Sequence, residues 1–138
     1  MWLPSLAIER WTKHARPPAD ARIALVIDAQ HGQRLYATTP AAAAAGARPG
    51  MRLTDARALD PGLAVVAADP AGDRALLRRL ARWASRWSPA VQCAAEDSLL
   101  LDTSGASHLF GGERRLADDI VQRFAVLGLG VRVAVAST

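Results

Sequence analysis

The segment "AAEDSLLLDTSGASHLFGG", residues 94–112, decides the fold class of this chain. The acidic pair Glu96-Asp97 precedes the apolar run 98–101, which is followed by a third acid, Asp102, and a glycine-containing turn. This pattern predicts a β-hairpin with acids at its tip. Carboxylates in such a place are the ligands that a metal-dependent phosphoryl-transfer enzyme uses. They are also common as plain turn and edge residues, and the residues alone leave both interpretations open.

The hairpin by itself does not supply a complete two-metal site. Two magnesium ions about 3.5–4 Å apart need several carboxylates that converge on one point. Side chains alternate between the two faces of a strand, so Glu96, Asp97 and Asp102 cannot all converge from this one segment. A metal site here therefore requires a further acid from elsewhere in the chain.

The bulk composition predicts a folded protein rather than a disordered or membrane-spanning one. The chain has 138 residues, of which 51% are hydrophobic, enough for one domain with or without a small subdomain. No apolar run approaches the roughly 20 residues of a membrane span, and residues 1–6 do not resemble a signal peptide. The single cysteine, Cys93, excludes an internal disulfide, which suits a cytoplasmic protein, and its apolar strand predicts a buried, unreactive thiol. The chain ends directly after a predicted strand, so we expect it to be a fragment of a longer protein.

Periodicity and turn residues predict a mixed α/β (α+β) fold. We expect residues 1–11 to form a short apolar strand or turn. Strands are predicted over 22–28, 33–39, 63–69, 90–95, 98–102 and from Gly130 onward; helices are predicted over 38–46, 55–59, 73–87 and 113–127. A threonine before Pro40 and Thr54 are the expected helix caps. The block 63–136 predicts a split β-α-β sheet with two helices on one face.

The helix predicted over 73–87 carries a candidate nucleic-acid surface. Arg74, Arg78 and Arg82 recur at four-residue spacing, on a different face from the apolar stripe that contains Trp83 and Trp87. Such a row of arginines can follow a phosphate backbone, although it can equally be a solvated helix face. The formal net charge of +4 is compatible with either interpretation.

The order of these segments resembles the N-terminal part of the Y-family, or translesion, DNA polymerases. "ATTPAAAAAGARPGM" (37–51) and "LTDARALDPGLAVVAADP" (53–70) are similar to segments of their fingers, and "EDSLLLDTSG" (96–105) to the palm hairpin with its "S-x-D-E-x-x-x-D" motif. The resemblance implies a palm-like split β-α-β sheet over 1–11 and 69–138 and a small fingers-like subdomain over 12–68.

The departures from the family pattern imply a degenerate active site. Asp97 falls on a metal-binding aspartate of the family, but Ser98 stands where the family has its catalytic glutamate. Trp2 and Pro4 stand where its first acids are expected. The Tyr and Arg that hold the triphosphate in the family correspond to Pro40 and Ala43. One metal ligand of three remains, so we expect no catalytic residue, no metal and no cofactor.

The stretches "WLPSLA" (2–7), "LLLD" (99–102) and "HLFGGE" (108–113) resemble the ImuB-type branch of these proteins more specifically. The resemblance implies a non-catalytic hub in damage-induced translesion synthesis, part of the SOS response. Its partners would be primer–template DNA, the sliding clamp, a RecA-like accessory protein and an error-prone polymerase, mostly through regions beyond residue 138. Two alternatives remain: an active nucleotidyltransferase with ligands from Glu96, Asp102 or later residues, and a plain α/β interaction module without a nucleic-acid role.

Overall fold

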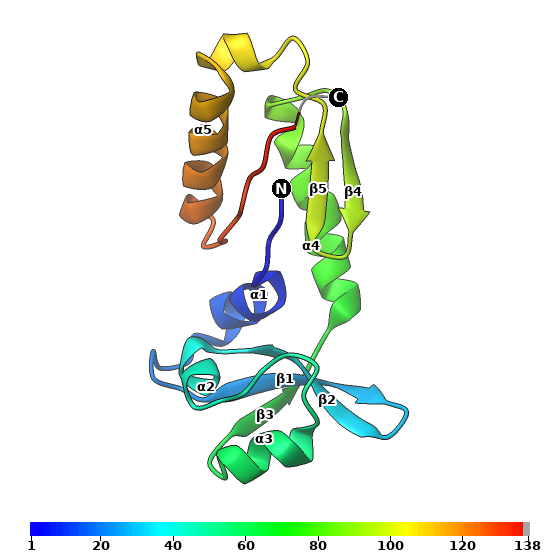
Figure 1. Cartoon of the computed structure of the whole chain (residues 1–138), viewed down its shortest axis with the longest axis vertical. Helices are drawn as coiled ribbons and strands as arrows, with labels where there is room; N and C mark the ends of the chain where they lie inside the picture. The colour runs from blue at the N-terminus through cyan, green and yellow to red at the C-terminus, as the bar shows by residue number, and fades with distance from the viewer. Residues whose placement is uncertain (137–138) are drawn as a thin grey trace. The chain divides into compact units, whose positions relative to one another are not determined.

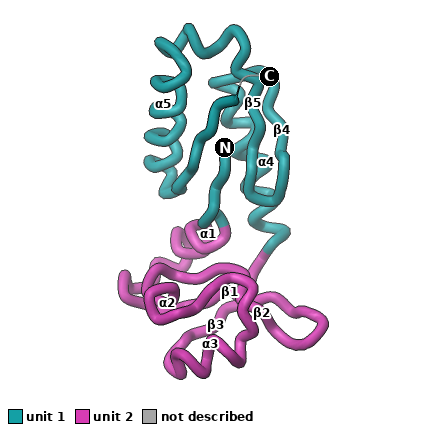
Figure 2. The backbone as a smooth tube through the Cα atoms, in the orientation of Figure 1, with its two compact units in different colours: residues 1–6, 70–138 teal, residues 7–69 magenta. Residues whose placement is uncertain are grey.

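The computed structural model describes residues 1–136 and divides into two compact units (Figure 2). Unit 1 combines residues 1–6 with the chain from Pro70 onward, and unit 2 comprises Ala7–Asp69. Each unit has its own sheet, helices and hydrophobic core. The chain is thus a mixed α/β protein, as its periodicity predicts.

The sheet of unit 2 contains the first predicted hairpin. β1 (Ile23–Ala29) pairs antiparallel with β2 (Gly32–Thr38) and parallel with β3 (Ala64–Ala67), in the order β2-β1-β3 (Figure 1). The placement of the 63–69 strand in a split β-α-β block with the later strands is therefore wrong. β3 returns to β1 because the two short helices between β2 and β3 form the crossover that a parallel pair requires.

Three helices accompany this sheet. They are α1 (Leu6–Ala15), α2 (Pro40–Ala44) and α3 (Leu53–Leu59). The expected strand or turn over residues 1–11 is wrong from Leu6 onward, because α1 buries Ile8 and packs Trp11 against Leu25 of β1.

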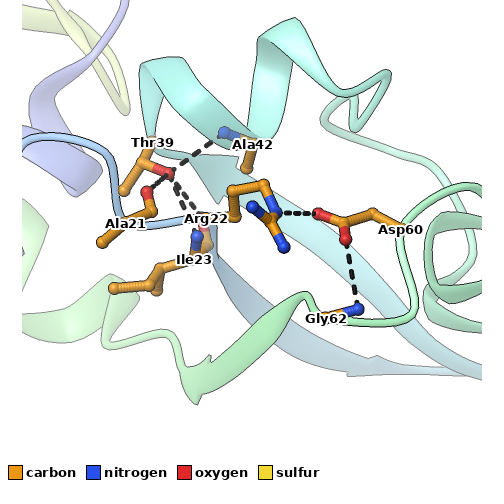
Figure 3. Close-up of polar contacts among 7 residues, drawn as sticks. All are labelled: Ala21, Arg22, Ile23, Thr39, Ala42, Asp60 and Gly62. Atoms are coloured by element: carbon orange, nitrogen blue, oxygen red, sulfur yellow. Dashed lines mark hydrogen bonds and ion pairs between the residues drawn. The ribbon is translucent and has the colours of Figure 1, made fainter.

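The helix caps differ from prediction in one of two cases. Thr39 caps α2 as predicted: its buried hydroxyl accepts from the backbone N–H groups of Ala42 at 3.3 Å and Ile23 at 3.0 Å (Figure 3). Thr54 does not cap α3, since that helix begins at Leu53, two residues earlier than predicted, with Arg52 at its N-cap and no side-chain cap. Asp60, at the end of α3, instead binds the Arg22 side chain at 2.7 Å (Figure 3).

Unit 1 contains the predicted hairpin with the acidic pair Glu96-Asp97 at its tip. α4 (Pro70–Trp83) and the short 3-10 turn Ala84–Arg86 precede β4 (Val91–Ala95) and β5 (Ser98–Leu101), which pair antiparallel. A second 3-10 turn, Ser107–Phe110, leads to α5 (Glu113–Val126). The two strands and both amphipathic helices agree with the predicted segments to within a few residues.

The N-terminal residues extend this sheet beyond β5. The N–H of Leu3 donates to the carbonyl of Asp97 at 2.9 Å, and the N–H of Leu99 donates to the carbonyl of Met1 at 2.9 Å. On the side of the N-terminal segment that faces away from β5, Trp2 exchanges two backbone hydrogen bonds of 2.8 Å with Arg132. Residues 1–3 therefore lie between β5 and the C-terminal segment. The strand predicted from Gly130 onward is reduced to this isolated bridge at Arg132 within the described residues, and its last two residues, 137 and 138, lie outside them.

One face of this sheet packs on the helices. Leu3 and Leu99 share a buried core with Leu77 and Leu80 of α4 and with the α5 residues Leu116, Ile120 and Phe124. Their sequence neighbours, Trp2 before Leu3 and Leu100 after Leu99, point to the opposite face and are exposed, as strand alternation requires. The unit therefore buries one face of its sheet and leaves the other open to solvent.

Candidate functional site

The candidate site is the tip of the β4–β5 hairpin, where Glu96 and Asp97 form the two-residue turn. The Asp97 carboxylate is held by two neighbours. Its Oδ2 accepts from the indole Nε1–H of Trp2 at 2.9 Å, and its Oδ1 accepts from the Ser98 hydroxyl at 3.2 Å. Both carboxylate oxygens of Asp97 are therefore engaged by protein donors.

Trp2 reaches Asp97 because residues 1–3 pair directly with β5. Trp2 lies opposite Ser98 on one side and Arg132 on the other, so these three side chains share the open face of the sheet. The guanidinium of Arg132 lies 5.2 Å from the centre of the Trp2 ring, within the range of a cation–π interaction. The indole of Trp2 thus contacts both the Asp97 carboxylate and the Arg132 guanidinium, while Pro4 is exposed just beyond the strand.

The other two acids of this segment do not join Asp97. Asp102 follows the far end of β5, about 16 Å away along an extended strand. Its Oδ1 accepts from the backbone N–H of Ser104 at 2.9 Å and from the Ser104 hydroxyl. These bonds stabilise the charged form and lower the pKa of Asp102 below its usual 3.8, the hydroxyl contributing most. Glu96 points toward Arg74 of α4, with 3.9 Å between Oε1 and Nη1.

Among residues 1–136, no three His, Cys, Asp or Glu side chains form a group that could hold a metal ion. The predicted burial of Cys93 is wrong: its side chain is exposed. β4 pairs only with β5 within the described sheet, so it is an edge strand, and its residues from Gln92 to Ala95 are open to solvent.

The two predicted triphosphate positions lie in unit 2, on α2. Pro40 is the first residue of that helix and Ala43 lies in its second half. Neither side chain has a polar atom, and proline also lacks a backbone N–H. The nearby hydroxyl of Thr39 is engaged by the backbone of β1 and α2. These positions therefore offer no side-chain donor to a phosphate.

The predicted arginine face of α4 is exposed. Arg74, Arg78 and Arg82 lie opposite the buried Leu77 and Leu80, so they form a basic row on the solvent side of the helix. Arg86, which the sequence also places beside this row, adds to the basic surface near the end of α4. Arg86 lies 4.6 Å above the ring of Trp83, which stacks edge-on against Trp87 at 5.1 Å.

A cleft of about 860 Å³ lies elsewhere in unit 1. Its lining includes Met1, Asp102, Ser107, Glu113, Ile120 and Val135. Neither Trp2 nor Asp97 lines it, so the cleft is separate from the hairpin tip.

Sequence reasoning identified Trp2 and Asp97 but missed the contribution of Arg132. The available signal was the alternation of the last predicted segment, which puts Arg132 on the face opposite Val131 and Val133, the valines that pack against the core. Nothing in that pattern says that Arg132 lies against Trp2, because the pairing joins the two ends of the described chain.

Comparison with known proteins shows which family this chain belongs to. The impB/mucB/samB family profile matches residues 12–138. The chain belongs to this family. It is 45% identical over 93 residues to Protein ImuB of Caulobacter vibrioides, in strain NA1000 / CB15N and equally in strain ATCC 19089 / CIP 103742 / CB 15. The aligned part covers 67% of this chain and 20% of the relative, so the chain spans about a fifth of the length of these relatives.

Three solved structures share the fold. The insertion ternary complex of Dbh DNA polymerase superposes with a TM-score of 0.77 at 13% identity, covering 94% of this chain and 39% of that one. The post-insertion binary complex of Dbh gives 0.78 at 14% identity, over 91% and 37%. DinB from Sulfolobus solfataricus gives 0.64 at 12% identity, over 93% and 37%. The predicted Y-family polymerase fold class is therefore confirmed. In the part of the chain that the structure describes, no helix is long and apolar enough to cross a membrane.

Proposed function

We propose that this impB/mucB/samB-family protein is a non-catalytic, polymerase-like adaptor in translesion synthesis induced by DNA damage. The observation that carries the proposal is the hydrogen bond from Trp2 to Asp97. At the position where the polymerase pattern calls for a second acid, this chain has an indole that donates to the remaining carboxylate. A hydrogen-bond donor in that place stabilises the charged Asp97 carboxylate without a cation. A second acid there would repel Asp97, so a bound cation would be needed to offset the repulsion.

The positions on α2 support the same proposal from unit 2. Pro40 and Ala43 stand where the polymerase pattern has the Tyr and Arg that hold the triphosphate, and neither can donate a hydrogen bond from its side chain. Phosphoryl transfer depends on positioning and charge stabilisation of the triphosphate, so losing these donors together with the acids removes both contributions.

We assign palm-like character to residues 1–11 and 69–138 and fingers-like character to residues 12–68. The two compact units, 1–6 with 70 onward and 7–69, divide the chain at nearby positions and give this assignment its support. In the cytoplasm, the adaptor would hold primer–template DNA and join the sliding clamp, a RecA-like accessory protein and an error-prone polymerase. We place these protein contacts mostly in regions beyond residue 138.

The exposed arginine row of α4 is our candidate DNA surface in unit 1. Replacing Arg74, Arg78 and Arg82 together by glutamine should weaken DNA binding and reduce its salt dependence, since each arginine that neutralises a phosphate releases counterions. The double variant Arg114→Gln, Arg123→Gln on α5 is a control for general loss of charge. Equal DNA binding by the triple variant and the unmodified protein would favour a plain interaction module.

Primer extension by the full-length protein tests the absence of catalysis. We expect no extension with magnesium or manganese while the protein still binds primer–template DNA. Extension that disappears in Asp97→Ala would overturn the proposal and establish an active polymerase whose further ligands come from outside the described hairpin. The variant Asp118→Ala, which removes an exposed acid of α5, is the matched control for Asp97→Ala.

A further inference from the structure

A pair of arginines lies side by side in unit 2, at the edge of its hairpin. Arg34 of β2 forms an isolated antiparallel bridge with Arg52, the residue before α3. Backbone hydrogen bonds hold the two segments together: the N–H of Leu35 donates to the Met51 carbonyl at 2.9 Å, and the N–H of Gly50 donates to the Leu35 carbonyl at 2.7 Å. Directly opposed residues point to the same face, with Cβ atoms about 4.5–5.5 Å apart. The two cationic side chains therefore leave the backbone next to each other.

Like charges in directly opposed positions destabilise a sheet. In the part of unit 2 that the structure describes, neither Arg34 nor Arg52 forms an ion pair. The contrast within the same unit is direct, because Arg10 pairs with Asp69 at 2.8 Å and Arg22 with Asp60 at 2.7 Å. Arg10 and Arg22 are thus ion-paired, whereas Arg34 and Arg52, like the other arginines of unit 2, have no ion pair within residues 1–136.

Hydrogen bonds from side chains hold the backbone around the pair. Nη1 of Arg34 donates to the Gly50 carbonyl at 2.8 Å, which orients that guanidinium and leaves its other donors available. Arg48, in the same loop, donates to the carbonyls of Ala43 at 2.6 Å and Ala47 at 2.9 Å, so it anchors the loop to the end of α2. Gly50 has φ of +87°, a left-handed conformation that glycine adopts without strain and that turns the chain back toward β2.

We propose that Arg34 and Arg52 form a clamp for a phosphate of a nucleic-acid backbone. Guanidinium groups present planar sets of donors that match phosphate oxygens, and an anion between them turns the repulsion of the pair into attraction. Arg52 is exposed at the surface. An open site of two cations suits a polymer with many phosphates, which gains affinity by adding many weak contacts. The proposal rests on the proposed DNA-associated function and adds a contact site in unit 2.

The test measures binding of a fluorescent single strand and a fluorescent duplex by anisotropy, between about 50 and 200 mM salt. For the double variant Arg34→Gln, Arg52→Gln we expect affinity to fall about 5- to 10-fold at low salt, equally for two unrelated sequences, and the salt slope to decrease by about 1. The matched control is Arg57→Gln, Arg114→Gln, which removes two exposed arginines from helices α3 and α5. Equal losses in the two double variants would overturn the clamp and leave only general charge.

The single variant Arg52→Gln separates binding from folding. The Arg52 side chain has no hydrogen bond or ion pair within residues 1–136, so its replacement removes only the unfavourable charge pair. We expect its Tm to be equal to or higher than that of the unmodified protein while DNA binding weakens. A lower Tm together with weaker binding would overturn the proposal, since it would assign Arg52 a structural role. Displacement of DNA by inorganic phosphate as effectively as by unlabelled DNA would also overturn it, in favour of a free-anion site.

The DNA-binding test of the clamp is independent of the primer-extension test for catalysis. Primer extension by the protein would end the adaptor proposal and leave the clamp intact. Unchanged DNA binding in the Arg34, Arg52 double variant, with weakened binding in the α4 triple variant, would end the clamp and leave the adaptor proposal intact.

Discussion

The indole Nε1 of Trp2 donates a hydrogen bond of 2.9 Å to Oδ2 of Asp97, across 95 residues of sequence. Trp2 is 44% exposed and the guanidinium of Arg132 lies over its ring. This relationship ties the N-terminal residues to the hairpin tip, and it occupies the carboxylate on which any metal chemistry at this site would depend. It also has consequences for stability that can be measured.

Removing the Asp97 carboxylate should destabilise the protein modestly. We expect Asp97→Ala to lower the free energy of unfolding by about 0.5–1.5 kcal/mol, because the indole N–H loses its acceptor at a partly exposed site. Asp97→Asn should lose less, since the amide oxygen still accepts from Trp2. Urea denaturation compares both with Asp118→Ala, an exposed acid of α5. A cost for Asp97→Ala no greater than that of the control would mean that the Trp2–Asp97 bond contributes nothing.

The capping threonines of unit 2 should differ sharply in their contribution to stability. Thr39 is buried and its hydroxyl links β1 to α2, so Thr39→Ala should cost about 1–2 kcal/mol (Figure 3). Thr54 is exposed and caps nothing, so Thr54→Ala should change stability by less than about 0.5 kcal/mol. Thermal unfolding measures both, and Thr39→Ser should recover most of the loss. Equal effects of the two alanine variants would contradict the hydrogen bonding of Thr39.

The core of unit 1 should depend strongly on Phe124. This side chain has no exposed surface and stacks 6.0 Å from Trp87, which is itself held by Asp119 at 2.8 Å. We expect Phe124→Ala to lower the free energy of unfolding by about 3–5 kcal/mol through lost burial and the cavity that remains. Val126, two residues along α5, is 87% exposed, and its replacement by alanine should cost less than about 0.5 kcal/mol. Guanidinium denaturation of the two variants provides the comparison.

The titration of Asp102 should depend on Ser104. The Ser104 hydroxyl and backbone N–H lower the pKa of Asp102 below 3.8 in the folded protein. A group with a lowered folded pKa contributes stability that is present above its unfolded pKa and is lost as the pH falls through the folded value. The contribution should therefore be complete above about pH 4 and disappear in more acidic solution.

Carboxyl NMR titration measures this directly. Ser104→Ala removes the hydroxyl, whose hydrogen bond lowers the pKa of Asp102 more than the backbone N–H does, so this pKa should rise toward 3.8. Ser107→Ala alters a hydroxyl with no hydrogen bond to Asp102 and should leave the titration unchanged. A pKa of Asp102 that is the same in both variants would show that the Ser104 hydroxyl does not stabilise the carboxylate.

Local patterns predicted most of the elements. The apolar spacing of α4 and α5, the two hairpins and the Thr39 cap are all encoded within stretches of a few turns, so the sequence indicates them directly. α1 was missed because residues 1–11 join a three-residue strand to a helix, and the short apolar start hides the change of period.

The candidate site was predicted only in its components. The segment resemblance pointed to Asp97 and Trp2 separately, and the hairpin spacing excluded a complete acidic cluster from that segment alone. The bond between Trp2 and Asp97 depends on residues 1–3 pairing with β5, which no local pattern indicates. The same holds for the pairing of Arg34 with Arg52, which depends on how one loop folds back on β2.

The sequence by itself therefore determined most of the helices and strands, α1 excepted, and the absence of any acid from residues 1–8. Tertiary structure alone decided the partners: β3 beside β1, Trp2 beside Asp97, Arg132 over Trp2 and Arg34 beside Arg52. The physical reason is one of range. Periodicity and capping act over three or four residues, whereas strand pairing is set by burial of a whole face and by backbone hydrogen bonds between segments far apart in the chain.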